Sequence, residues 1–187
     1  KSSTNISVKY LIANVLSCLI DDERVQTLLL DFDVAKQSTD LLLKVKHTEY
    51  HKLLSLARIL LHLSAKAELF DKLGKAVGQK KHVTKIVSLL SLDNDKLLLI
   101  IVNLLGNLSL HQTCCSLITK TGGLSAIIKV LKEADPIEES ELLSESILAI
   151  SKFNQNEKGR LTIAKERVVP FILSILDNTK DNSEIQL

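Results

Sequence analysis

The feature that most constrains this chain is a repeat of 44 or 45 residues. The segments 14–20, 58–64, 103–109 and 148–154 align without gaps, and the sixth residue of each is a large apolar side chain. These markers are Leu19, Leu63, Leu108 and Phe153, at separations of 44, 45 and 45 residues. A fixed period of this length predicts an array of similar units, each of which completes its core by stacking on its neighbours.

A second set of apolar runs follows the first at a constant distance. Leu42, Leu131 and Leu176 each lie 23 residues after the marker of their own unit. In the second unit the matching run, 86–90, comes about four residues late, so we expect the lysine-rich stretch 75–81 to be a local insertion. The period divides a single repeat domain, 1–187, into units at about 4–46, 47–92, 93–134 and 135–179.

Each unit is predicted to contain three helices. The first is long, with apolar residues three or four positions apart. Short second helices are expected at 68–73, 113–119, 157–164 and, in the first unit, 23–30, and the third helix ends in the second apolar run. Aromatic residues make up only 3% of the chain and Leu and Ile are abundant, which favours an all-α core over a sheet.

Residues that typically start or end helices agree with these boundaries. Gly122 and Gly123 predict a helix stop and a tight turn. Pro170 is expected in the first turn of its helix, where its missing N–H is tolerated. Further helix starts are predicted near Asp93, Asp95 and Asp135.

The third unit resembles the armadillo repeat. Three of its segments, LLGNLS at 104–109, TGGL at 121–124 and IIKVL at 127–131, are similar to three parts of that repeat. They match the Ala-Leu-x-Asn-Leu ending of the armadillo repeat's third helix, its Gly-Gly turn and its apolar second helix. In the armadillo numbering, therefore, the long helix of each unit here counts as the third helix. The resemblance implies a right-handed α-solenoid of about four three-helix units, in which the outer units can be incomplete. HEAT repeats are the nearby alternative, disfavoured by the short middle helix.

In armadillo proteins the long helices line a concave groove that binds a partner peptide, so the resemblance implies such a groove here. The residues themselves support it, because an unpaired amide sealed in an apolar core costs about 1–3 kcal/mol. Asn103 and Asn107 share one helix face and should therefore meet solvent or a ligand. The same register in all units gives the predicted partner-binding residues Asn14, Cys18, His51, Ser55, Arg58, His62, Lys96, Asn103, Asn107, Glu141, Leu148 and Lys152.

The predicted function is a non-catalytic scaffold that holds a protein or peptide segment in this groove. Arg58, His62 and Lys152 favour an acidic or phosphorylated ligand, although Glu141 and Glu145 oppose this at one end. Family members that bind nuclear-import signals carry a Trp one turn before the groove Asn, and this chain has no Trp, so that specificity is not implied. Two alternatives stay open: a structural module that self-associates through exposed repeat ends, and a regulatory domain of a larger enzyme.

Other patterns predict no chemistry. The chain has no phosphate-binding loop, dinucleotide fingerprint or G-x-S-x-G, so it is expected not to be an enzyme and to need no cofactor. His47 and His51 have helical spacing but no third ligand, and His111 with Cys114 and Cys115 lacks the spacing of a zinc site. No metal is therefore predicted.

Charge and cysteine content suggest an intracellular protein, cytoplasmic or nuclear. The net charge of +2 gives no strong attraction to nucleic acid or membrane, and three cysteines are too few for a disulfide framework. The uncharged stretch 97–119 is long enough to span a membrane, but its asparagines and other polar residues argue against that. Because the chain starts at Lys1 and contains no Met, we expect a fragment of a longer protein. A basic cluster is interpreted as a solvated loop, since no aromatics interleave it to indicate nucleic-acid binding: Lys72, Lys75, Lys80, Lys81, His82 and Lys85.

Overall fold

The computed structural model describes residues 2–22, 24–25, 29 and 33–179, and in these ranges the chain is helical with no strand. The predicted all-α class is confirmed. The first unit's expected short helix, 23–30, lies mostly outside the described residues. The helices are α1 (Ser2–Leu19), α3 (Val34–Lys44), α4 (Tyr50–Ala65), α5 (Ala67–Val77), α6 (Lys80–Ser88) with the 3-10 turn η1 (Leu89–Ser91), α7 (Asp95–Leu108), α8 (Gln112–Lys120), α9 (Gly123–Glu133), α10 (Ser140–Phe153), α11 (Glu157–Lys165) and α12 (Val168–Thr179).

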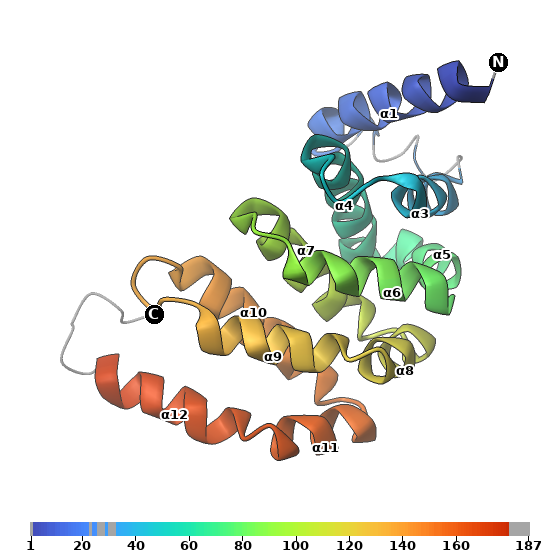
Figure 1. Ribbon diagram of the computed structural model, residues 1–187. Coiled ribbons are helices and arrows are strands. Elements are labelled where there is room, and N and C mark those ends of the chain that lie inside the picture. The colour runs from blue at the N-terminus through green and yellow to red at the C-terminus, as the bar shows by residue number, and fades with distance from the viewer. Residues whose placement is uncertain (1, 23, 26–28, 30–32, 180–187) are drawn as a thin grey trace.

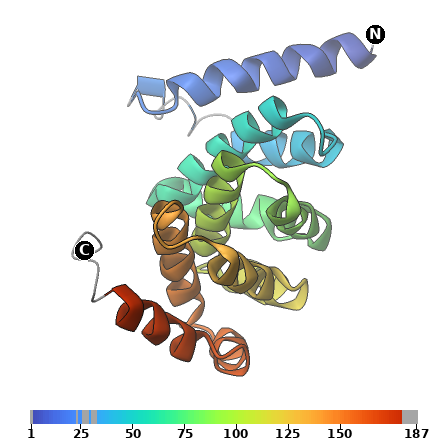
Figure 2. The same cartoon turned by 60° about the vertical axis from the view of Figure 1, so that its left-hand side comes forward.

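The helices stack in three rows that follow the sequence period. The long helices α1, α4, α7 and α10 pack side by side, each on the next, with α1 and α12 at opposite ends of the stack (Figures 1 and 2). The short helices α5, α8 and α11 form a second row. In the third row, each helix also packs on the long helix of the following unit: α3 on α4, α6 with η1 on α7, and α9 on α10. Each unit therefore closes the core of the one before it.

We call each contact between a third-row helix and the long helix of the following unit a joint. The residues that mark the period are buried at these joints. Leu63, Leu108 and Phe153 are completely or almost completely buried, as are Leu42 and Leu131. Only the markers in the first long helix and in α12 are exposed. The period is thus a pattern of packing between units, and it is left incomplete at the two ends.

Helix boundaries follow local capping chemistry. Asn94 caps α7, since its side-chain oxygen accepts a hydrogen bond from the Leu97 N–H at 2.9 Å, between the two aspartates predicted to start this helix. The Asp135 carboxylate accepts from the N–H groups of Glu138 and Ile137 in the turn before α10, which lowers its pKa. Gly122 ends α8 in the left-handed region, at φ 78°, where other residues are strained.

The lysine-rich stretch 75–81, predicted to be a local insertion within a basic cluster interpreted as a solvated loop, is largely helical. Residues 75–77 end α5, and Lys80 begins α6. α5 has 11 residues where α8 and α11 have 9. Leu69, Leu73 and Val77 are buried one turn apart, so the apolar face of α5 simply continues through its two extra residues.

Close contacts fix neighbouring units to one another. A Cβ atom at Gly106 of α7 would lie 2.8 Å from both Cα and Cβ of Ala149 on α10, so these two long helices nearly touch. Tyr10 of α1 donates a hydrogen bond to the Leu41 carbonyl at 3.2 Å, and the Lys52 ammonium lies 4.8 Å from the centre of its ring. Tyr10 thereby ties α1 to both α3 and α4.

No helix in the described ranges is by itself long and apolar enough to cross a membrane. α8 and α9 match the length and composition only as a pair, bent by 69° at their junction.

Candidate functional site

The predicted partner-binding residues fall into rows across the stacked long helices, because positions one period apart are equivalent. Within each helix the rows are seven and then four residues apart, which places them on one face. We call this surface the long-helix face. Its first row is His51, Lys96 and Glu141; its second is Asn14, Arg58, Asn103 and Leu148; its third is Cys18, His62, Asn107 and Lys152.

The second row lies largely at the surface. Asn14, Arg58 and Leu148 are exposed, and Asn103 is half-buried between Arg58 and Leu148. The side-chain amide of Asn103 makes no hydrogen bond to any other residue that the structure describes. Its two donor hydrogens and its acceptor oxygen therefore remain open to a partner.

The third row is used to hold the units together. Asn107 donates from Nδ2 to Ser64 Oγ at 2.9 Å and accepts at Oδ1 from Lys152 Nζ at 2.7 Å. These two bonds link α4, α7 and α10 through one side chain. Although the sequence places Asn103 and Asn107 in the same class, the structure gives Asn107 a structural role.

Two further predicted residues are turned inward or satisfied internally. Ser55 is buried, with its hydroxyl 2.9 Å from both Asn14 Oδ1 and the His51 carbonyl oxygen. His62 is half-buried, and its Nε2 has no hydrogen-bond partner among the described residues. Burial, together with the nearby Lys66 charge, lowers the pKa of His62 against the opposing effect of Asp21. At neutral pH this imidazole adds no positive charge to the face.

A pocket of about 190 Å³ opens beside the first row, between the N-terminal turns of α7 and α10. Of the predicted residues, Lys96 and Glu141 line it, and so do three carboxylates that the repeat register did not indicate. The turn before α10 brings two of these into place, and such turns do not follow the helical period. The added residues are Asp95, Glu138 and Glu139.

The charge of the long-helix face therefore changes from positive to negative along the stack. Arg58 and His51 are exposed on α4, whereas carboxylates dominate the pocket between α7 and α10. Lys152 is engaged with Asn107 and contributes less to the open surface.

The basic cluster around α5 and α6 does not form one surface. His82 is buried, 3.5 Å from an Asp40 carboxylate oxygen, and the Lys85 ammonium donates to the Val45 carbonyl at 2.8 Å. Lys75, Lys80 and Lys81 remain exposed, and Lys72 is exposed with an interaction of its own.

The histidines and cysteines are dispersed. In the part of the chain that the structure describes, no three His, Cys, Asp or Glu side chains are grouped so that they could hold a metal ion. His47 lies in the turn before α4, 3.3 Å from the Ser88 hydroxyl. Burial, with Cys115 alongside, raises the pKa of Cys114 to about 12, so this thiol stays protonated.

Comparison with known proteins gives no relative: the chain matches no protein-family model, and no curated protein is significantly similar to it. Its own sequence and geometry are therefore the basis for a functional assignment.

Proposed function

We propose that this chain is a non-catalytic scaffold, an armadillo-like α-solenoid that binds an extended segment of another protein across the long-helix face. The repeated order of long, short and third helix supports the solenoid, as does packing that links each unit mainly to its neighbours. The thiols of Cys18, Cys114 and Cys115 are all free, which supports a reducing location in the cytoplasm or nucleus.

The observation that carries this proposal is the open amide of Asn103 in the middle of the second row. A side-chain amide can donate to one peptide group and accept from another, which makes it suited to an extended backbone. Packed helices lie about 8–10 Å apart, and an extended chain rises about 3.3 Å per residue. A segment lying across the helices would therefore meet a new long helix about every three residues.

Charge along the face specifies the segment further. An acidic or phosphorylated side chain fits beside Arg58 and His51 on α4. A basic side chain fits the pocket that Glu141 lines between α7 and α10. An apolar side chain fits Leu148, which is 51% exposed. The ligand is thus an extended segment with an acidic residue about four or five positions from a basic one, because the pocket lies between α7 and α10.

A phage-displayed library of random peptides, panned against the purified chain, tests this proposal. Enriched peptides should carry opposite charges at the stated spacing, and their affinity should be measured by fluorescence polarisation. The double substitution Arg58→Glu with Asn103→Ala should weaken binding by about a hundredfold or more, since it removes both an amide contact and a charge pair.

Lys129→Glu is the matched control. It makes the same charge change on exposed α9, outside the long-helix face, and should leave peptide affinity unchanged. Peptides that bind the double variant as well as the unaltered chain would refute the proposed site.

A further inference from the structure

The first long helix exposes apolar residues at positions that every other unit buries. Ile12, Val15 and Leu19 of α1 are 52%, 50% and 49% exposed. Their equivalents are buried, and are Leu56, Ile59 and Leu63 in α4, Ile101, Leu104 and Leu108 in α7, and Ser146, Ala149 and Phe153 in α10. We call Ile12, Val15 and Leu19 the α1 end face.

The opposite end of the stack shows the same pattern. Val169, Leu173 and Leu176 of α12 are 58%, 54% and 53% exposed, and we call them the α12 end face. The residues one period earlier, Leu124, Ile128 and Leu131 of α9, are buried. α9 buries this face at the joint where it packs on α10.

The interior joints explain what each end face fits. Each of the three joints places a third helix on the long helix of the next unit: α3 on α4, α6 with η1 on α7, and α9 on α10. In the described ranges α12 is a third helix with no long helix on its outer side, and α1 is a long helix with no third helix before it. The two ends therefore carry complementary halves of the same kind of joint.

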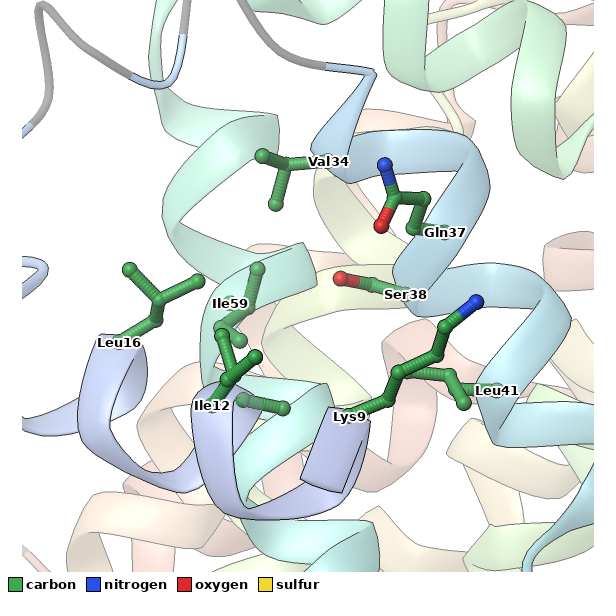
Figure 3. A pocket seen from close by; sticks show the side chains of 9 residues that line it. Lys9, Ile12, Leu16, Val34, Gln37, Ser38, Leu41 and Ile59 are labelled. Carbon is green, nitrogen blue, oxygen red and sulfur yellow. The ribbon is translucent and has the colours of Figure 1, made fainter. Parts of the chain in front are cut away.

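A pocket lies next to the α1 end face. It has a volume of about 80 Å³ and is mostly apolar, with the side chains of α1 and of α3 on its two sides and Ile59 of α4 between them (Figure 3). Ile12 and Leu16 line it together with Val34. This space accommodates an aliphatic side chain of the type that α12 exposes.

We propose that the chain self-associates head to tail, with the α12 end face of one copy packed on the α1 end face of the next. The second copy is the occupant because this contact would continue a joint that the chain already builds three times within itself. Contact between two different faces is heterologous, so it repeats from copy to copy and gives an open row or a closed ring. This association is separate from ligand binding on the long-helix face.

Sedimentation velocity over a wide dilution series tests the proposal. The unaltered chain should form species that grow with concentration. Val15→Lys on α1 and Leu173→Lys on α12 should each raise the dissociation constant by roughly a hundredfold, because each would place an unpaired charge in an apolar contact. Both positions are exposed within one chain, so circular dichroism should show unchanged helicity.

Mixing the two variants is the decisive arm. Val15→Lys keeps the α12 end face and Leu173→Lys keeps the α1 end face, so a mixture can form one joint and should stop at a 1:1 dimer. A monomer at every concentration, or a mixture that forms no dimer, would overturn the proposal. A mixture that assembles beyond the dimer would overturn it equally.

Two controls separate this association from other effects. Ile137→Lys changes a side chain that is 70% exposed in the turn before α10, outside both end faces, and should leave association intact. Arg58→Glu with Asn103→Ala should also associate normally, so loss of peptide binding and loss of self-association are read independently.

Discussion

Two asparagines one turn apart on α7 have opposite roles. The Asn107 side chain bonds to Ser64 and Lys152 on the two neighbouring long helices, whereas the side-chain amide of Asn103 makes no hydrogen bond to a described residue. Sequence register places both on the same polar stripe. It cannot separate them, because the difference depends on which side chains the neighbouring helices bring within 3 Å.

Replacing each asparagine with alanine should reveal this difference in stability. Asn107→Ala should lower the free energy of unfolding by about 1–2 kcal/mol, since two hydrogen bonds between units are lost. Asn103→Ala should change it by less than about 0.5 kcal/mol. Urea denaturation followed by circular dichroism measures both, and equal losses would contradict the assigned roles.

Two sequestered histidines predict a loss of stability in acid. Burial, with Lys81 nearby, lowers the pKa of His82 despite Asp40, and burial also lowers the pKa of His62. As the pH falls through the pKa of an unfolded histidine, about 6.5, the unfolded chain takes up protons more readily than the folded one. The contribution of these two neutral histidines to the free energy of unfolding is therefore fully present above this pH and is lost below it.

Thermal unfolding between about pH 8 and about pH 5 measures this slope. His82→Gln should flatten the dependence of the melting temperature on pH. His51→Gln, at an exposed position, should keep the full slope because His62 and His82 are still present. A slope that is the same in all three proteins would refute the linkage to His82.

At the scale of the element, the crossing of α7 and α10 depends on a missing side chain. A Cβ added at Gly106 would lie 2.8 Å from the Cα of Ala149. The two backbones can therefore approach this closely only because residue 106 is a glycine.

The direction in which one substitution changes the free energy of unfolding tests this close crossing. In an ordinary helix interior Gly→Ala stabilises by about 1 kcal/mol. Gly106→Ala should instead lower the free energy of unfolding by about 1 kcal/mol or more, because overpacking costs about 1–3 kcal/mol. Urea titration gives the sign directly, and a stabilised variant would mean that the two helices lie further apart.

Helices and their order could be predicted because their cause is periodic. Apolar spacing located the long helices, and Gly122 marked the turn before α9. The longer α5 was missed because the lysine-rich stretch was interpreted as part of a loop, although Leu73 and Val77 continue the buried face of this helix. The acidic residues around the pocket were missed because Glu138 and Glu139 come from an irregular turn, whose geometry carries no period.

For the whole molecule, stacking predicts that stability is highest in the centre. α7 packs between α4 and α10, whereas α1 and α12 each lie at one end of the stack. Units that contact mainly their neighbours unfold from the ends, since a terminal unit loses one interface rather than two.

Amide hydrogen exchange in dilute protein, where the end faces stay open, checks this order. Amides of α4 and α7 should exchange most slowly, and those of α1 and α12 fastest. At high concentration the end helices should gain protection if copies associate. Uniform protection along the chain in dilute protein would show that it unfolds as a single block.

The contacts of Tyr10 give this chain a built-in optical reporter. There is no Trp, so its ultraviolet fluorescence and near-ultraviolet dichroism arise mainly from Tyr10 and Tyr50. Tyr50 is partly exposed at the start of α4, whereas the Tyr10 phenol bonds across to Leu41 and lies under Lys52. When α1 separates from the stack, the surroundings of Tyr10 change. A Tyr50→Phe chain would therefore report the detachment of its first helix spectroscopically, without any added label.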